Sequence, residues 1–286
     1  MPINLNGKII AADQPIFTAG NRAFRYGDGL FESIRVFGGR LPFLERHWQR
    51  LSAGFGLLKF EVPDFFTPSL IKNEVGKLTE SKGNWRIRLT VWRSGGGLYT
   101  PETNLPEFLI EATPLNSALF ELNQSGLKIG IFNQELLPHH SQKTHQKLHN
   151  LKTTSALPFV LASIFKKENR LDDCLLLNTA GRLACASSSN IFLVKNGELF
   201  TPPLTEGCIA GTMRANVLEL AGQLGIKTNE VQVPISELEK ADEILLTNAI
   251  QGVRWAQKIQ GQNTQFQCKT AGMLVDALNQ QLKHFT

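Results

Sequence analysis

The sequence predicts a mixed α/β protein of two domains, with the active site in the cleft between them. The 286 residues exceed a typical single domain of about 150 residues, so two domains are expected. Patterns typical of strands and of helices are mixed in both halves of the chain. Residues 113–125 lose this patterning and are rich in Asn, Ser and Pro, which is typical of a linker. We expect a smaller N-terminal α/β domain over residues 1–117 and a larger domain over residues 118–286.

The first half contains two hairpin signals. Asn6-Gly7 predicts a tight turn within residues 3–10. Phe37-Gly38-Gly39 predicts a second hairpin, pairing residues 31–36 with residues 40–43. Hydrophobic periodicity further predicts a helix over 44–58 and strands over 85–92 and 108–112.

The second half predicts a series of buried strands with helices between them. Strands are expected over residues 127–132, 174–177, 191–194 and 244–246. One helix is expected to follow the Lys152 region and run to about Asn169. Two others are expected from Thr212 to Leu224, closed by Gly225, and from Ala271 to Leu282.

Composition excludes several classes of protein. The hydrophobic fraction of 42% with a charged fraction of 19% excludes disorder as the main state. No uninterrupted apolar run is long enough for a membrane helix, and residues 1–20 show no secretory signal pattern. The four cysteines have no CxxC spacing, so a reduced, cytoplasmic chain is expected. The net charge of +5 comes from scattered basic residues, which favours an anionic small molecule over nucleic acid.

Two basic residues are candidates for chemistry. Lys152 lies among small hydroxyl residues just before an apolar helix, a setting that can activate an amine. Arg50 lies on the helix expected over 44–58 and could hold a phosphate. Considered alone, each is also compatible with a solvated surface residue.

Two further segments could bind a phosphate. Gly207-Cys208-Ile209-Ala210-Gly211 leads into the helix at Thr212, whose free N–H groups would attract an anion. The segment lacks the Gly-Lys-Ser/Thr ending of a P-loop, and an ordinary capped helix remains the alternative. Thr247 and Asn248 follow a strand and could close the site from another side.

The four histidines His139, His140, His145 and His149 raise the question of a metal. They include no HExxH pattern, and no carboxylate lies within the run. We therefore expect a polar loop leading to Lys152 and no metal site.

In order and spacing, these segments resemble the class IV pyridoxal phosphate (PLP) enzymes of fold type IV. This family contains branched-chain aminotransferases, D-amino-acid aminotransferases and 4-amino-4-deoxychorismate lyase. The resemblance covers residues 6–259 and is carried by the segments YGDGLFESIR, HWQRL, LKTTSALPFVLA, GRLACASSSNIFLV, NGELFTPPLTEGCIAGTMR and ADEILLTNA.

The resemblance implies PLP as the cofactor, bound mainly by the C-terminal domain, and a homodimer acting on a small anionic substrate. Lys152 would form the Schiff base and move the proton at the substrate carbon. The phosphate would be held by Arg50, by Thr212 and Met213, and by Thr247 and Asn248. The substrate side would be lined by Tyr26, Arg35 and Arg88.

One residue departs from the family pattern. Members usually place a glutamate against the pyridine nitrogen within GxVxExxxSN, and Cys185 occupies that position here. A thiol, with an ordinary pKa of about 8.5, is mostly neutral and cannot hold a pyridinium by charge. Ser155 also replaces an asparagine that usually follows the lysine. These changes would weaken transamination more than an elimination driven by forming an aromatic ring.

Three functions follow from this resemblance. The first is 4-amino-4-deoxychorismate lyase, which releases pyruvate and makes 4-aminobenzoate for folate biosynthesis. The Gly211-Thr212-Met213-Arg214 segment is similar to the lyase form, whereas Phe31-Glu32 is shared with aminotransferases. The second is a branched-chain or D-amino-acid type aminotransferase. The third is a paralogue that has lost the cofactor and serves in binding, motivated by Cys185 and Ser155. A nucleic-acid module would need a basic stripe, which the sequence lacks.

Overall fold

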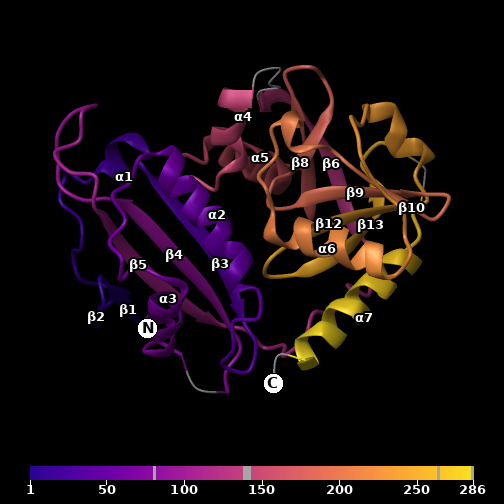
Figure 1. Cartoon of the computed structure of the whole chain (residues 1–286). Helices are drawn as coiled ribbons and strands as arrows, with labels where there is room; N and C mark the ends of the chain where they lie inside the picture. The colour runs from indigo at the N-terminus through magenta and orange to yellow at the C-terminus, as the bar shows by residue number, and fades with distance from the viewer. Residues whose placement is uncertain (80–81, 138–142, 263–264, 285–286) are drawn as a thin grey trace. The chain divides into compact units, whose positions relative to one another are not determined.

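The computed structural model describes residues 1–79, 82–137, 143–262 and 265–284, which form two compact units (Figure 1). The first unit contains Met1–Leu119 and, from the middle of the chain, Leu151–Ser155. The second contains Phe120–Asn150 and Ala156–His284. Each unit combines strands with helices, which confirms the expected mixed α/β class.

The first unit is built on a five-stranded antiparallel sheet with the strand order β2-β1-β5-β4-β3. In chain order, its elements are β1 (Pro2–Leu5), β2 (Lys8–Ala11), α1 (Arg22–Tyr26), β3 (Gly29–Val36), α2 (Leu44–Leu57), α3 (Pro68–Gly76), β4 (Trp85–Arg93) and β5 (Pro106–Pro114).

The structure confirms one of the two expected hairpins. β1 and β2 pair around Asn6 and Gly7, and both residues have a positive φ, as the tight turn requires. The prediction of the second hairpin is wrong, because β3 pairs with β4 and only a single bridge joins Phe37 to Arg40. Pro42 has no N–H to donate to a strand partner, and the chain instead enters α2 at Leu44.

The two faces of this sheet differ in chemistry. One face presents Ile87, Leu89 and Val91, which pack with residues of α2 and α3 into a buried core. Both helices are labelled in Figure 1. Because side chains alternate along a strand, the intervening Arg86, Arg88 and Thr90 point to the opposite face. The first face therefore stabilises the unit, and the second is available for polar chemistry.

The segment that carries Lys152 extends this sheet at the edge of β3. The N–H of Phe31 donates to the carbonyl of Lys152 at 2.8 Å, and the N–H of Thr154 donates to the carbonyl of Gly29 at 2.9 Å. A Cβ on Gly29 would lie 2.8 Å from the carbonyl oxygen of Val91, so a glycine is required where these three segments meet. The main chain thereby fixes the position of Lys152 relative to β3.

The second unit is built on an eight-stranded mixed sheet with the order β11-β10-β9-β12-β13-β6-β7-β8. Its strands are β6 (Leu127–Leu137), β7 (Asp173–Asn178), β8 (Leu183–Ala186), β9 (Asn190–Lys195), β10 (Glu198–Thr201), β11 (Thr228–Glu230), β12 (Glu243–Asn248) and β13 (Gly252–Ile259). Its helices are α4 (Lys143–Asn150), α5 (Leu157–Glu168), α6 (Thr212–Gln223) and α7 (Lys269–His284), with short 3-10 helices η1 (Leu204–Glu206) and η2 (Ile235–Lys240).

Most helices and strands of the second unit lie where the hydrophobic pattern predicts them. The helix expected from Thr212 begins at that residue, and Gly225 follows it with a positive φ of 71°. α5 spans Leu157–Glu168 and follows the Lys152 segment, as expected.

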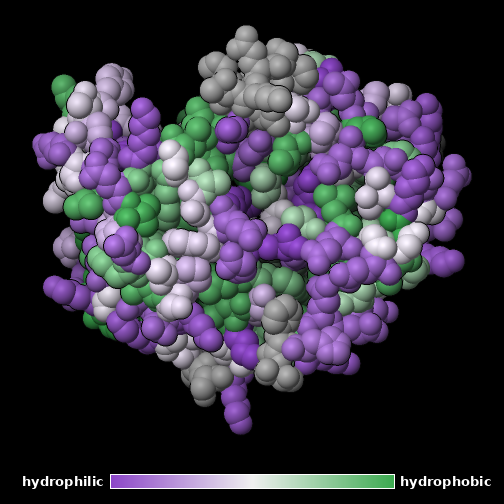
Figure 2. All heavy atoms as spheres, in the orientation of Figure 1, coloured by the Kyte–Doolittle hydropathy of each residue, from purple (hydrophilic) through white to green (hydrophobic). Residues whose placement is uncertain are grey.

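The described residues contain no helix that is long and apolar enough to span a membrane. Hydrophilic and hydrophobic residues are intermixed over the face shown in Figure 2.

Candidate functional site

Lys152 lies against an aromatic ring in the first unit. Its Nζ atom is 4.3 Å from the centroid of the Phe31 ring, and the Cζ atom of Arg88 is 4.0 Å from the same centroid. Two cations therefore contact one ring, which stabilises each of them through the negative face of the π system. The sequence predicted Lys152 and Arg88 as site residues, and the structure brings them together on Phe31.

Arg50 takes part in a buried charge network on the other face of β3. Its Nε and Nη2 atoms donate to the two carboxylate oxygens of Glu32 at 2.8 and 2.5 Å. His47, one turn earlier on α2, donates from Nδ1 to the same carboxylate at 2.7 Å. The carboxylate of Glu32 thus holds Arg50 in a fixed orientation.

The charges around Glu32 keep it ionised. Burial raises the pKa of its carboxyl, but Arg50 and His47 outweigh this effect and lower the pKa to about 2. The sequence motifs assign no role in the site to Glu32. The signal in the sequence is an acid on the strand face whose neighbours Leu30 and Ile34 belong to the core.

The environment of Lys152 favours a neutral amine. Burial and, to a lesser extent, the charge of Arg50 lower the pKa of Lys152 to about 8, although Glu32 opposes the shift. An amine with this pKa has a substantial neutral fraction near physiological pH, so it can act as a nucleophile and as a base.

The other two residues expected on the substrate side have different surroundings. Arg35 is buried, and its Nη2 atom donates to the carbonyls of Ser117 and Leu119 at 2.9 and 2.8 Å. Tyr26 ends α1, with its ring 5.5 Å from the exposed ring of Tyr99. Arg35 therefore anchors the end of the first unit, while Tyr26 contacts the loop after β4.

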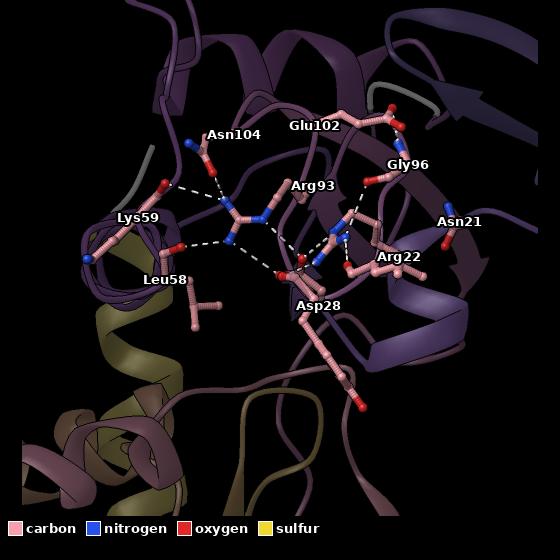
Figure 3. Close-up of polar contacts among 12 residues, drawn as sticks. Asn21, Arg22, Asp28, Leu58, Lys59, Arg93, Gly96, Glu102 and Asn104 are labelled. Atoms are coloured by element: carbon pink, nitrogen blue, oxygen red, sulfur yellow. Dashed lines mark hydrogen bonds and ion pairs between the residues drawn. The ribbon is translucent and has the colours of Figure 1, made fainter.

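That loop is fixed by a second ion network (Figure 3). Arg22 and Arg93 donate from Nε to the same oxygen of Asp28 at 2.8 and 3.0 Å. Arg22 also donates to the carbonyls of Gly96 and Leu98, which lie in the loop. Burial raises the pKa of Asp28, but the two arginines outweigh it and hold the pKa below its ordinary value. Asp28 of the YGDG segment is thus a structural anchor.

The second unit forms an anion cradle at the start of α6. The N-cap residue Gly211 offers no side chain to the first N–H groups of the helix, which begins at Thr212. The amide of Asn190 donates to the carbonyl of Ile209 at 2.9 Å and ties this loop to β9. A Cβ on Gly211 would overlap the side-chain oxygen of Asn190, so a larger residue here would require the Asn190 side chain to move.

β12 brings Thr247 to the same place, because Thr247 lies opposite Asn190 in the strand pairing. The Thr247 hydroxyl is buried and has no hydrogen-bond partner among the described residues. Asn248 donates to the Ser189 hydroxyl at 3.2 Å. An orphaned hydroxyl beside a helix N-terminus fits a phosphate, which would accept from both.

The structure places Met213 and Cys185 in the interior of the second unit. Met213 lies in the first turn of α6 with its side chain buried, so it can offer its N–H group to an anion. Cys185 is buried on β8 in an apolar cluster that includes Leu176 and Phe132. The turn that follows it is held by Asp173, which accepts from the Ser187 hydroxyl at 2.5 Å.

Over the part of the chain that the structure describes, no cluster of three or more His, Cys, Asp or Glu residues could hold a metal. His139 and His140 lie outside the described residues.

The chain matches the family model for class IV amino-transferases over residues 29–259. It is 30% identical over 255 residues to a putative branched-chain-amino-acid aminotransferase of Methanocaldococcus jannaschii, which covers 86% of this chain and 84% of the relative. A 4-amino-4-deoxychorismate lyase from Pseudomonas aeruginosa has a TM-score of 0.80 at 26% identity, covering 97% of this chain and 98% of that one. A Brucella abortus aminotransferase bound to PLP has a TM-score of 0.82 at 21% identity, covering 99% of each.

The chain therefore belongs to the class IV aminotransferase family of PLP-dependent enzymes. The similar proteins include both aminotransferases and a lyase. They therefore show the family and its PLP cofactor, which both activities share.

Proposed function

We propose that this protein is a 4-amino-4-deoxychorismate lyase, which converts its substrate into 4-aminobenzoate and pyruvate. The observation that carries the proposal is Cys185, a buried thiol at the position where the family pattern has a carboxylate. Without that negative charge, the cofactor ring withdraws electrons less strongly. An elimination that creates an aromatic ring has its own driving force and tolerates this loss better than transamination does.

The residues of the first unit supply binding and proton transfer. The amine of Lys152 would hold the cofactor covalently until the amino group of the substrate displaces it, and its pKa of about 8 suits this role. The freed Nζ atom would then take the proton from the substrate carbon that bears the amino group and return it to the departing pyruvate. PLP, when bound, supplies the sink for the electrons of the broken bonds.

Each unit by itself offers groups suited to bind an anion such as the phosphate. Arg50 supplies a guanidinium whose direction is set by Glu32. The N–H groups of Thr212 and Met213 and the hydroxyl of Thr247 supply donors at the helix start, with Asn248 bordering them. On the substrate side, Tyr26 and Arg88 are proposed contacts.

A comparison of the parent protein with Cys185→Glu tests the proposal. The parent should release pyruvate from 4-amino-4-deoxychorismate with no keto acid present, and should form little glutamate from 2-oxoglutarate and an amino donor. Cys185→Glu should raise the transamination rate about tenfold or more, because a carboxylate keeps the ring nitrogen protonated. Both rates are measured on PLP-loaded protein.

Cys185→Ser serves as the matched control, since it changes the side chain without adding a charge. Equal transamination rates in all three proteins would show that residue 185 does not act on the ring nitrogen. A parent that transfers amino groups and releases no pyruvate would reject the lyase function. Thermal unfolding identifies any variant whose core has been disrupted.

The second candidate is a branched-chain aminotransferase, favoured by the 30% identity to the Methanocaldococcus jannaschii relative. Formation of glutamate from 2-oxoglutarate with leucine or valine as donor would support it. Failure of the protein to retain PLP would instead support a role in binding.

We also propose that the enzyme works as a homodimer and that α5 lies at the interface. Leu157, Val160, Leu161 and Ile164 form an apolar stripe on this helix, and each is 44–70% exposed. Their spacing places them on one helical face. Contiguous exposed apolar surfaces of this kind are typical of protein interfaces.

Ile164→Glu should convert the dimer into monomers, because burying an unpaired carboxylate in an apolar interface is strongly unfavourable. Light scattering coupled to size-exclusion chromatography would show the mass falling by half. Leu224→Glu is the control, since Leu224 is a similarly exposed apolar residue outside the stripe. A parent that is already monomeric, or an Ile164→Glu variant that stays dimeric, would contradict the assignment.

A further inference from the structure

Asn150 ties the end of α4 to the loop that leads into α6, residues 204–211, which we call the α6 entry loop. Its Nδ2 atom donates to the carbonyl of Leu204 at 3.0 Å and to the carbonyl of Cys208 at 2.7 Å. In addition, the N–H of Ala210 donates to the main-chain carbonyl of Asn150 at 3.0 Å. All three bonds lie within the second unit, so they hold the α6 entry loop to α4 at three points.

The partners of Asn150 are not those of an asparagine that serves its own helix. Asparagine side chains commonly bond to main-chain groups only a few residues away. The two acceptors of Asn150 are 54 and 58 residues along the chain. Since a carbonyl oxygen can only accept, the amide offers one of its two hydrogens to each of them. Asn150 therefore stabilises the α6 entry loop and not the end of α4.

A buried charge fixes the first part of the α6 entry loop. Glu206 is fully buried, and its Oε2 atom accepts from Arg182 at 2.6 Å and from Asn178 at 2.7 Å. A buried carboxylate is costly without such partners, so this residue cannot easily leave its place. Asn150 fixes the part of the loop after Glu206, which leads directly to the helix.

The place of this second part determines how α6 presents its first N–H groups. Ala210 immediately precedes the N-cap residue Gly211, and the helix begins at Thr212. A helix start binds an anion through N–H groups that point toward it. If the preceding loop could move, ordering it on binding would cost affinity. Asn150 therefore keeps the anion cradle in a conformation ready to bind.

Lys152 keeps its position independently of the Asn150 amide. It follows Asn150 by two residues, but the main chain of its own segment is bonded to Phe31 and Gly29 in the first unit. Removing the amide should therefore alter the α6 entry loop and leave the amine in place. The effects on phosphate binding and on the amine can thus be measured separately.

We propose that Asn150 is a positioning residue for the cofactor phosphate, which acts through the α6 entry loop. The inference rests on the proposed function in one respect, that the phosphate binds at the start of α6. Asn150 then contributes to the affinity for a phosphate group, and contributes little to the affinity for the rest of the cofactor.

Binding of inorganic phosphate to the cofactor-free protein, measured by calorimetry, tests the proposal. Asn150→Leu keeps the size and neutrality of the side chain and removes both donors. It should raise the Kd for phosphate about tenfold or more, because two carbonyls lose their donor and the loop is released. Asn150→Gln keeps the amide and should raise the Kd less than about threefold. Asn150→Ala removes the same donors and takes the place of Asn150→Leu if that protein does not fold.

A second measurement compares PLP with pyridoxal, which lacks the phosphate. After borohydride reduction, mass spectrometry gives the fraction of Lys152 labelled at each concentration of either aldehyde. The parent should prefer PLP, and Asn150→Leu should reduce that preference about tenfold or more. Labelling by pyridoxal should stay within about twofold of the parent, whereas a general loss of structure would reduce labelling by both aldehydes equally.

Asn123→Leu is the matched control, because Asn123 also donates from Nδ2 to two main-chain carbonyls of the second unit, at 2.8 and 3.0 Å. It should leave both measurements at their parent values. Equal effects of the two leucine variants, an unchanged Kd for phosphate in Asn150→Leu, or an equal loss of labelling by PLP and pyridoxal would overturn the proposal.

The same data separate this proposal from the lyase function. A protein whose phosphate binding depends on Asn150 and which releases no pyruvate keeps the role of Asn150 and rejects the lyase. Pyruvate release together with phosphate binding that Asn150→Leu does not change has the opposite meaning.

Discussion

Lys152→Ala should lower the rate of pyruvate release at least a thousandfold. The variant loses both the covalent attachment of the cofactor and the base that moves the substrate proton. It should still fold, since the main chain of this segment, not the lysine side chain, makes the hydrogen bonds to Phe31 and Gly29. The measurement is the steady-state rate, together with the PLP that remains after borohydride reduction and dialysis.

Lys167→Ala is the matched control, because Lys167 is an exposed lysine in the last turn of α5. Lys167→Ala should retain the parent rate and the parent amount of reduced cofactor. Lys152→Arg should be as inactive as Lys152→Ala, because a guanidinium keeps the charge but is not deprotonated. A Lys152→Ala protein that releases pyruvate at the parent rate would remove Lys152 from the mechanism.

Glu32→Gln should destabilise the protein by about 3 kcal/mol or more, since it leaves the nearly buried Arg50 without its carboxylate. The amide keeps the shape of the side chain, so the loss reports on charge and not on a cavity. Urea unfolding measures the free energy. Glu45→Gln, a change at an exposed position on α2, should cost less than about 0.5 kcal/mol. Equal stabilities of the two variants would contradict the role of the network.

The same variant should also change the pH dependence of stability. The pKa of Glu32 is lowered from 4.5 to about 2, so its charge stabilises the fold fully above pH 4.5. This contribution is lost as the pH falls through about 2, and Glu32→Gln should remove that part of the acid dependence.

Glu32→Gln should act on Lys152 as well, which separates positioning from a purely structural role. The negative charge of Glu32 raises the pKa of Lys152, so its removal should bring that pKa below about 8. The pH dependence of acetylation of the cofactor-free protein, measured residue by residue by mass spectrometry, gives this pKa. An unchanged midpoint for Lys152 would show that Glu32 does not act on the amine.

Local features of the site could be predicted from the sequence because their causes are local. Gly211 before Thr212 indicates a helix start with free N–H groups, whatever lies around it. Asn6-Gly7 likewise selects its turn through its own backbone preferences. Lys152, Arg50 and Cys185 are identifiable by their place within motifs, which requires no knowledge of the distances between residues.

The sequence by itself determined the class of protein, the elements around the start of α6 and the replacement of the family's carboxylate by Cys185. The tertiary structure determined which charged side chains contact one another. Glu32 contacts Arg50 and His47 because β3 packs against α2. Lys152 lies in the first unit, although it comes from the second half of the chain, because its segment pairs with β3. The strand register places Arg35 opposite Arg86. Arg35 donates hydrogen bonds to main-chain carbonyls, whereas Arg86 has no partner among the described residues. Electrostatic interactions depend on the distance between charges, and only packing brings together residues far apart in the chain.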